Sequence, residues 1–456
     1  MTTQDSNNKA GSVSIDEVFI ISRNNVEYNI KDIVIEINLF EDMYQPCLTG
    51  NVQVSDGHDL INLLPIVGEE LIRIKLSTPS FPAGDCLYKT FKIYAITDKT
   101  PVMTDTTQVF TIHFISQEGF LDSAFPIQGT FTGNVNDVAS SIFNKYIQLP
   151  RNTKDGVELD GNTELLLTDT TKNVIQFNSP NWTAFKCINY VAARSLRTDN
   201  DGSNFVFFET NKTFVFGSVQ ELIDMQVKQK FLLESYKYSP PNSDFPDGNH
   251  GGFQFRKPDL STEYRIVEEF HTDEDFNLLN SNMTGHLANR IITYDLLHKQ
   301  VNTLDYDYLA EWYKYKHIDY NSVLESGSPV VSSSQLRASV SSTSVYPQNQ
   351  LLFSGGKDTT NKYIDKIISS RKSLMADINA RRVSILVNGR WDAEVGMLVE
   401  FLMPSFKSKP LNTDENVFDP FYSGIYLITC IRHKVNAQNH KMVMELCKDS
   451  TTGNKS

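Results

Sequence analysis

The sequence predicts a mainly β protein with α+β elements, in which two similar antiparallel β-barrel, tube-like domains are joined by a helix-containing domain and a long insertion. Two observations lead to this prediction. Apolar and polar residues alternate with a period of two over much of residues 12–116 and again over 382–450, as in half-buried strands. Between these stretches, apolar residues recur at three- and four-residue spacing, which is typical of amphipathic helices.

The length of 456 residues corresponds to roughly three domains of about 150 residues each. Shifts in composition suggest where the parts begin and end. The expected parts are, in chain order, a disordered tail at 1–11, the first barrel at 12–120, a helix-containing middle domain at 121–202, the second barrel at 203–239 and 382–450, an insertion at 240–381 and a disordered tail at 451–456.

The first barrel is indicated by a series of short alternating segments with few helical stretches between them. Such a series is typical of a small antiparallel barrel or sandwich. The alternating segments are DIVIEINLF, LTGNVQVSD, EELIRIKLS, KTFKIYAITD and QVFTIHFIS.

Two helices and a hairpin are predicted next. The segment NVNDVASSIFNKYIQ has Asn134 or Asn136 as a candidate N-cap. The segment SPNWTAFKCINYVAARS carries an apolar helical stripe, with Pro180 in its first turn and Trp182 at its head. The segment NFVFFETNKTFVFGSV is typical of a hairpin, and we expect Trp182 to be buried between the middle region and this hairpin.

The insertion has the composition of exposed chain in two places. It contains the Pro/Gly-rich segment SPPNSDFPDGNHGGF and a serine-rich loop at 322–344 with almost no aromatic residues. A helix is predicted at 361–380. It is followed by the expected strands RVSILVNG, GMLVEFLMPS, GIYLITCIRHKV and KMVMELCKDS.

An echo between the two ends of the chain suggests that the barrels are related. In each, a glycine opens an alternating strand, a tyrosine precedes a strand with an Ile-Thr pair, and a third alternating strand follows. The matched residues are Gly68 and Gly396, Tyr88 and Tyr422, and Ile96-Thr97 and Ile428-Thr429. The echo indicates two structurally related barrels, although unrelated antiparallel barrels share some of these features.

Composition excludes several classes of protein. The formal net charge of −13 argues against tight binding of nucleic acid, which requires basic surfaces. No apolar run of roughly 18 residues is present, and the polar N-terminus lacks the apolar core of a signal peptide. Five cysteines without CxxC spacing indicate reduced thiols rather than disulfides or a zinc site: Cys47, Cys86, Cys187, Cys430 and Cys447.

Three segments are candidate metal sites. TDNDGSN offers Asp199 and Asp201 in a calcium-loop pattern, but Arg197 and Phe208 would stand where the first and last acidic ligands belong, so a turn is favoured. DEDF at 273–276, after His271, is more typical of a solvated acidic turn. A third candidate is the pair of histidines flanking a polar turn, His433 and His440, which lacks a third local ligand.

No catalytic, cofactor-binding or metal-ligating residue is predicted. The motifs G-x-S-x-G, G-x-G-x-x-G, HExxH and the P-loop are absent. A glycosidase needs only two carboxylates, which sequence alone does not exclude. The aromatic segment DYDYLAEWYKYKHIDY at 305–320 suits either a nucleic-acid or sugar platform, or an apolar face with a protein-contact surface, and we favour the second.

The chain resembles the baseplate hub proteins of contractile-tailed bacteriophages and the hub portion of type VI secretion spike proteins. The resemblance is carried by the Pro-Asn-Trp entry at 180–182, the helix AFKCINYVAARS, the hairpin FVFFETNKTFVFGSV and the closing strands YSGIYLITCIRHKV and KMVMELCKDS. The motifs occur in order over most of the chain, while the region 240–358 is longer and richer in serine than the resemblance leads us to expect.

The resemblance implies a structural virion protein without enzymatic activity or cofactor. Such hubs are homotrimers whose two barrels per subunit form a pseudo-six-fold ring between the central spike protein and the tail tube or tube-initiator protein, bordered by baseplate wedge proteins. DNA transits the lumen without specific binding, no membrane is involved, and assembly takes place in the host cytoplasm. The alternatives are a tail-associated cell-wall or polysaccharide hydrolase and a carbohydrate-binding adhesin.

Overall fold

The computed structural model describes most of the chain between residues 9 and 451. The described ranges are 9–57, 59–64, 66–80, 86–102, 107–148, 153–154, 157–158, 164–229, 235–238, 260–272, 277–296, 298–322, 342–348, 363–404, 418–419 and 421–451. None of the helices in these ranges has the length and apolar character needed to span a bilayer.

The first barrel consists of six strands near the N-terminus. They follow one another around the barrel in the order β1-β5-β6-β7-β4-β3. Their bounds are β1 Ser14–Ile21, β3 Val34–Asp42, β4 Thr49–Asp56, β5 Leu71–Ser77, β6 Cys86–Val102 and β7 Thr107–Ser116. Three short elements accompany them: β2 Glu27–Asn29, which pairs with β1, the 3-10 helix η1 Lys31–Ile33 and α1 Leu60–Leu63.

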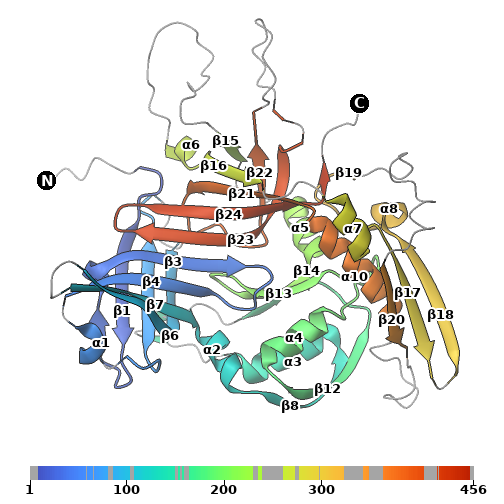
Figure 1. The fold of residues 1–456 in the computed structure, drawn as a ribbon, viewed down its shortest axis with the longest axis horizontal. Helices are drawn as coiled ribbons and strands as arrows, with labels where there is room; N and C mark the ends of the chain where they lie inside the picture. Colours follow the sequence, from blue (N-terminus) through green and yellow to red (C-terminus); the bar gives the residue numbers. More distant parts are fainter. Residues whose placement is uncertain are drawn as a thin grey trace, which may run out of the picture.

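The second barrel is closed and also has six strands. The order is β15-β22-β23-β24-β21-β16, and the pairing of β15 with β16 closes the circle. The bounds are β15 Ser235–Tyr238, β16 Ile266–Thr272, β21 Arg381–Asn388, β22 Leu398–Leu402, β23 Gly424–Asn436 and β24 His440–Lys448. Because β3 pairs with β23, both barrels belong to one 13-stranded sheet, and they lie side by side in Figure 1.

The two barrels have the same strand order, which confirms the prediction of two similar barrels. Numbered along the chain, both follow the order 1-4-5-6-3-2. The glycines that open the echoed strands also share a conformation, since Gly68 has φ of 97° and Gly396 has φ of 89°. A residue with a Cβ atom is disfavoured in this left-handed region.

Two details of the expected barrels are wrong. The Ile-Thr pairs are not equivalent, because the β-bulge of β23 lies between Ile428 and Cys430 and the matching bulge of β6 lies between Ile93 and Ala95, three residues before Ile96. The second barrel is also not fully antiparallel. Its first strand, β15, runs parallel to both neighbours, whereas β1 is antiparallel to β5.

The middle domain packs helices against small sheets below the barrels in Figure 1. Its elements are α2 Gln117–Ala124, β8 Ile127–Asn134, α3 Val135–Tyr146, β9 Thr153–Lys154, β10 Val157–Glu158, β11 Leu165–Leu167, β12 Val174–Trp182, α4 Ala184–Ala192, β13 Phe205–Glu209, β14 Phe214–Ser218 and α5 Val219–Gln229. Asn134 is the N-cap of α3, because its side chain accepts a hydrogen bond from Asn136 N. The predicted hairpin is β13–β14.

The expectation that Trp182 is buried against the hairpin is wrong. Pro180 and Trp182 both lie in β12, and the helix begins only at Ala184, after the N-cap Thr183. Trp182 is half-buried, with its ring centroid 5.1 Å from that of Tyr190. The ring contact with the hairpin is made by the next aromatic residue, Phe185, whose centroid lies 5.6 Å from that of Phe207.

Several segments form hydrogen bonds with other parts of the protein than the expected domain boundaries imply. The hairpin pairs with β11 rather than with the second barrel, while β16, from the expected insertion, belongs to that barrel. Residues 342–344 of the serine-rich loop begin β20, and 323–341 lie outside the described residues. In the expected N-terminal tail, Gly11 O accepts a hydrogen bond from His440 N at 2.7 Å.

The insertion builds a three-stranded sheet with a helix on one face. β17 Ala288–Asp295 pairs with β18 Gln300–Asp307 and with β20 Ser342–Pro347, and α10 Ile364–Ile378 packs against β17. The helix lies within the predicted range 361–380. The remaining elements are α6 Leu260–Glu263, α7 Leu278–Thr284, α8 Tyr308–Glu311, η2 Trp312–Lys314, β19 Asn321–Ser322 and β25 Ser450–Thr451.

Candidate functional site

The joint between the barrels is built from one strand of each. β3 and β23 pair antiparallel over seven residue pairs, from Glu36↔Asn436 to Asp42↔Cys430. Side chains reinforce the pairing, because the Arg432 guanidinium donates two hydrogen bonds to Asn38 Oδ1 at 3.0 and 2.9 Å. A cross-strand ion pair adds to it, with Lys434 Nζ 3.1 Å from a carboxylate oxygen of Glu36. The two barrels are therefore connected by backbone and by matched polar side chains.

A buried tryptophan couples the cores on the two sides of the joint. Trp391 follows β21 of the second barrel, yet it packs in the hydrophobic core of the first barrel together with Val435. Its ring stacks on two imidazoles, with centroids 4.6 Å from His433 and 4.5 Å from His440. The second barrel thus supplies part of the first barrel's core.

The two histidines weighed as metal ligands in the sequence are brought together here. His433 Nδ1 and His440 Nε2 share a hydrogen bond of 3.0 Å. Burial lowers the pKa of His433 to about 3, and burial together with the neighbouring His433 lowers the pKa of His440 well below its usual range. Both rings are therefore neutral. The described residues place no third ligand beside them, so the pair fits a packing role at the joint.

A second buried polar group at the joint consists of acidic residues around one lysine. Glu209, at the end of β13, pairs directly with Lys89 of β6 and also accepts a hydrogen bond from Leu48 N at 2.8 Å. Glu41 of β3 lies nearby with Glu394. Burial, followed by the charge of Glu394, raises the pKa of Glu41 to about 8. Glu41 is therefore largely protonated at neutral pH.

This raised pKa leads to a pH-dependent prediction. An acid whose folded-state pKa is raised contributes stability that is fully present below its unfolded pKa, here near 4.5, and is lost as pH rises through about 8. We expect Glu41→Gln, which keeps a neutral side chain at every pH, to raise the free energy of unfolding increasingly between pH 5 and 9. Urea denaturation of both proteins at each pH measures the difference. A constant difference across this range would contradict the assignment.

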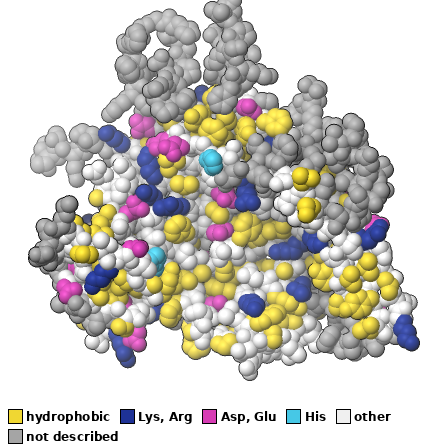
Figure 2. All heavy atoms as spheres, viewed as in Figure 1, with side chains coloured by type: hydrophobic (Ala, Val, Ile, Leu, Met, Phe, Trp, Pro, Cys, Tyr) yellow, Lys and Arg dark blue, Asp and Glu magenta, His cyan; other side chains and the backbone are white. Residues whose placement is uncertain are grey.

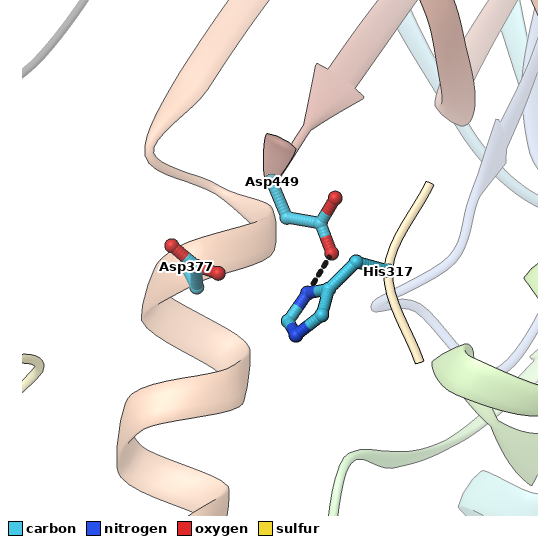
Figure 3. Close-up of side chains that lie close together, drawn as sticks. All are labelled: His317, Asp377 and Asp449. Atoms are coloured by element: carbon cyan, nitrogen blue, oxygen red, sulfur yellow. Dashed lines mark hydrogen bonds and ion pairs between the residues drawn. The ribbon is translucent and has the colours of Figure 1, made fainter. Parts of the chain in front are cut away.

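One cluster of candidate metal ligands is not predicted from the sequence. His317, Asp377 and Asp449 come from three separate parts of the chain and lie close together in Figure 3. His317 Nδ1 lies 2.9 Å from Asp449 Oδ2, and its Nε2 lies 2.9 Å from the carbonyl oxygen of Trp312. Because both partners are acceptors, both ring nitrogens donate, which requires the imidazolium form.

The electrostatics support an ion pair rather than a metal ligand. Burial opposes the charge of His317, but the hydrogen bond and charge of Asp449 outweigh it and raise its pKa. Burial likewise opposes the Asp449 carboxylate, and the bond to His317 holds its pKa below the usual range. Asp377 is occupied by the Tyr308 hydroxyl at 2.7 Å and by His286 at 3.3 Å. No lone pair of His317 remains for a cation.

The carboxylates of the calcium-like segment are also neutralised by cations. Asp199 binds Arg197 through two hydrogen bonds of 2.8 Å, and Asp201 pairs with Lys172 and Lys366. The segment forms a turn, as the favoured interpretation predicts. Residues 273–276, the acidic segment after His271, lie outside the described residues. The cysteines are free thiols.

The aromatic segment at 305–320 divides into a buried and an exposed set. The buried rings form one small core with Leu374 of α10 and comprise Tyr306, Tyr308, Trp312 and Tyr315. Tyr313 and Tyr320 are 83% and 90% exposed. Hydrophobic side chains also gather over the neighbouring sheet of β17, β18 and β20 in Figure 2. This arrangement agrees with an apolar face, while the contact role of the exposed rings stays a prediction.

Comparison with known proteins gives matches in structure alone. No family model matches the chain, and neither does any curated protein sequence. The tail protein from Neisseria meningitidis MC58 is 10% identical, with 95% of this chain and 96% of that chain covered at a TM-score of 0.51.

Two further structures match at lower TM-scores. They are the 43 kDa tail protein of prophage MuSo2 from Shewanella oneidensis, with 8% identity, coverage of 95% and 98% and a TM-score of 0.46, and the c3393 protein of E. coli, a type VI secretion component, with 7% identity, coverage of 91% and 73% and a TM-score of 0.39. The match to the tail protein from Neisseria meningitidis MC58 confirms the resemblance predicted from the sequence at the level of fold, because this chain shares the fold of that protein.

Proposed function

We propose that the protein is a structural component of a phage tail, the baseplate hub of a contractile tail. The observation that carries the proposal is the repeated barrel: one chain holds two six-stranded barrels of identical strand order, joined edge to edge through β3 and β23. The shared fold with a tail protein supports the same assignment.

A repeated barrel suits a position between three-fold and six-fold structures. Three chains with two barrels each supply six similar units, so a trimer forms a ring with pseudo-six-fold symmetry. Such a ring matches a trimeric central spike on one side and a six-fold tail tube, or a tube-initiator protein, on the other, with baseplate wedge proteins around it. Ring closure requires a heterologous contact between neighbouring subunits.

The charge of the chain suits a lumen through which DNA passes without specific binding. The net charge is −13, and like charge repels a phosphate backbone. On the face seen in Figure 2, acidic and basic side chains are interspersed, with no continuous basic surface. The proposed location is the virion baseplate, after assembly in the host cytoplasm.

We also propose a non-enzymatic role, which the pairing of acidic residues at the site supports. Most of the buried acidic clusters of the described residues are held by cations or hydrogen bonds, as at Lys89–Glu209 and His317–Asp449. An activated nucleophile or a pair of opposed free carboxylates, which hydrolysis of cell wall or polysaccharide needs, finds no support there.

The oligomeric state tests the proposal. We expect light scattering to give the mass of a homotrimer, either for the protein alone or after co-expression with its spike protein. A monomer under both conditions contradicts the hub. Degradation of peptidoglycan that one carboxylate substitution abolishes favours a hydrolase instead, and binding of glycans by the isolated chain favours an adhesin.

A further inference from the structure

The outer side of α4 carries aromatic and basic side chains in alternation. Trp182, Lys186, Tyr190 and Arg194 follow one another at intervals of four residues, so they lie in one row along the helix. Lys186 Nζ lies 5.1 Å from the centroid of the Trp182 ring, and Arg194 Cζ lies 3.6 Å from that of Tyr190. The two rings also contact each other, with centroids 5.1 Å apart. These four side chains, which we call the α4 row, therefore form one continuous series of cation–π and ring contacts.

The α4 row faces solvent in the single chain. The opposite side of the helix packs in the hydrophobic core of the middle domain, through residues that include Phe185 and Ile188. In the α4 row, Lys186 is exposed and the other three side chains are half-buried. Figure 2 shows basic side chains among hydrophobic ones at the lower centre of the view, where Figure 1 places α4.

The cations of the α4 row have no acidic partner. Among the described residues, no carboxylate pairs with Lys186 or Arg194, and the Arg194 guanidinium donates no hydrogen bond. Asp122, at the start of α4, is occupied by a hydrogen bond of 2.7 Å from Phe185 N. The chain has 55 acidic and 42 basic residues, so a surface with unpaired cations differs from its general charge.

A second arginine, from α10, adds positive charge beside Arg194. Arg371 Nη1 donates hydrogen bonds to the carbonyl oxygens of Ser203 and Phe205 at 3.1 and 3.0 Å. Ser203 Oγ in turn donates to the carbonyl oxygen of Ser195, the neighbour of Arg194, at 2.7 Å. Burial lowers the pKa of Arg371 to about 10, and the like charge of Arg194 acts in the same direction. The two guanidinium groups are thus close enough to repel each other.

The positive surface continues past the end of α4. The backbone N–H of Lys172 donates to Leu196 O at 2.9 Å, which places Lys172 beside the chain that follows Arg194. The Lys172 ammonium shares one carboxylate, that of Asp201, with the ammonium of Lys366, at 3.0 and 2.9 Å. One negative charge therefore faces two positive charges, and this part of the surface also has an excess of positive charge.

We propose that the α4 row, together with Arg371, is a docking surface for an acidic segment of a partner protein, whose Asp or Glu carboxylates bind the three cations. The inference goes beyond the proposed hub role and does not depend on it. A guanidinium binds a carboxylate through two parallel hydrogen bonds. Stacking on Tyr190 orders Arg194 before binding, which lowers the entropic cost of the contact. Trp, Tyr and Arg are also the residues that dominate binding energy at protein interfaces.

The spacing of the cations favours separate carboxylates over a single phosphate. Lys186 and Arg194 are eight residues apart, which corresponds to about 12 Å along a helix. Each side chain lies over the ring one turn before it, so the two charged groups stay apart and bind different anions.

The same contacts argue against nucleic acid as the partner. Bases stack on the free faces of aromatic rings. Here cations of the chain itself already lie over Trp182 and Tyr190. The net charge of −13 also repels a phosphate backbone.

Binding of synthetic peptides to the full chain tests the docking surface. The probe is a labelled peptide in which glutamate alternates with serine, and the control peptide has glutamine in place of every glutamate. Fluorescence anisotropy at low ionic strength measures the Kd. We expect the wild type to bind the glutamate peptide and not the glutamine peptide, and added salt to weaken the binding.

Substitutions in the α4 row identify the binding residues. Lys186→Gln combined with Arg194→Gln should raise the Kd about tenfold, because two charge contacts are lost. Lys186→Arg combined with Arg194→Lys keeps both charges and should bind nearly as the wild type does. Lys75→Gln is the matched control, because the Lys75 ammonium lies over the Tyr88 ring in the first barrel. It removes a cation of the same kind and should leave the Kd unchanged.

Several results would overturn the inference. They are a wild type that does not bind the glutamate peptide, equal binding of both peptides, and an unchanged Kd in the double glutamine variant. Tighter binding of a single-stranded oligothymidylate or of inorganic phosphate than of the peptide assigns the surface to nucleic acid or to a small anion instead. Melting temperatures show whether the variants fold. If the double glutamine variant does not fold, Lys186→Gln and Arg194→Gln are measured singly, each with an expected rise in Kd of about threefold. The readout needs no trimer, so it is independent of the test of the hub.

Discussion

Replacing Trp391 by alanine is expected to lower the free energy of unfolding by about 3–5 kcal/mol, the usual cost of removing a buried tryptophan. The ring is 2% exposed, stacks on His433 and His440 and completes the core of the first barrel. Its loss leaves a cavity at the joint, so both barrels should be affected. Urea denaturation monitored by fluorescence and circular dichroism measures the change.

Trp182→Ala is the matched control for this prediction. Its indole is half-buried and contacts Tyr190 and Lys186 on the outer side of α4. We therefore expect a clearly smaller loss of stability from the same substitution. Equal losses at the two positions would show that the joint does not depend on Trp391 in the way that its burial indicates.

The second large effect is expected from Lys89→Met. Removing one partner of a buried ion pair typically costs about 3–5 kcal/mol, because the other charge stays buried without compensation. Glu209 is 1% exposed, and Glu41 and Glu118 are buried close enough to interact with Lys89. Loss of the ammonium therefore leaves several acids together between the first barrel and the hairpin β13–β14.

A double variant separates the charge effect from the loss of packing. Lys89→Met combined with Glu209→Gln removes both charges and keeps a hydrogen-bonding group for Leu48 N. We expect this double variant to be more stable than Lys89→Met alone in equilibrium unfolding by urea. If the double variant is the less stable of the two, the interaction between Lys89 and Glu209 is not what stabilises this region.

Local patterns in the sequence were sufficient to predict the strands, most helices and the repetition of the barrel. The alternation in β5, β6, β7 and their counterparts depends only on one face being buried, so it is visible in the sequence. The N-cap at Asn134 likewise depends on neighbouring residues only. These features are decided within about ten residues.

Features that depend on distant residues could not be predicted. The hairpin β13–β14 has the same pattern whichever sheet it joins, and its pairing with β11 is set by tertiary packing. The predicted match between the two Ile-Thr pairs is wrong by three residues, because the bulges that align β6 with β23 are not visible in an alternating pattern. The position of Trp182 could not be predicted because the strand continues past a bulge at Asn181, where φ is 62°, and Trp182 still pairs with Ile127 before the helix begins.

In the candidate site, too, contacts between residues near in sequence could be predicted, whereas contacts between distant residues could not. The pair of His433 and His440 is visible in the sequence because the two residues flank one turn, and a hairpin brings the ends of its strands together. His317 and Asp449, by contrast, are 132 residues apart and meet only because the insertion returns to the end of the second barrel. No spacing in the sequence indicates that pair.

The pairing of β3 with β23 also determines how the two barrels respond to mechanical load. Hydrogen bonds in an antiparallel ladder run across the strands. A pull along the strand axis therefore shears all seven residue pairs at once instead of unzipping them one by one. Because Trp391 also packs in the core of the neighbouring barrel, a force applied to one barrel is transmitted to the other through both the strand pairing and this buried side chain.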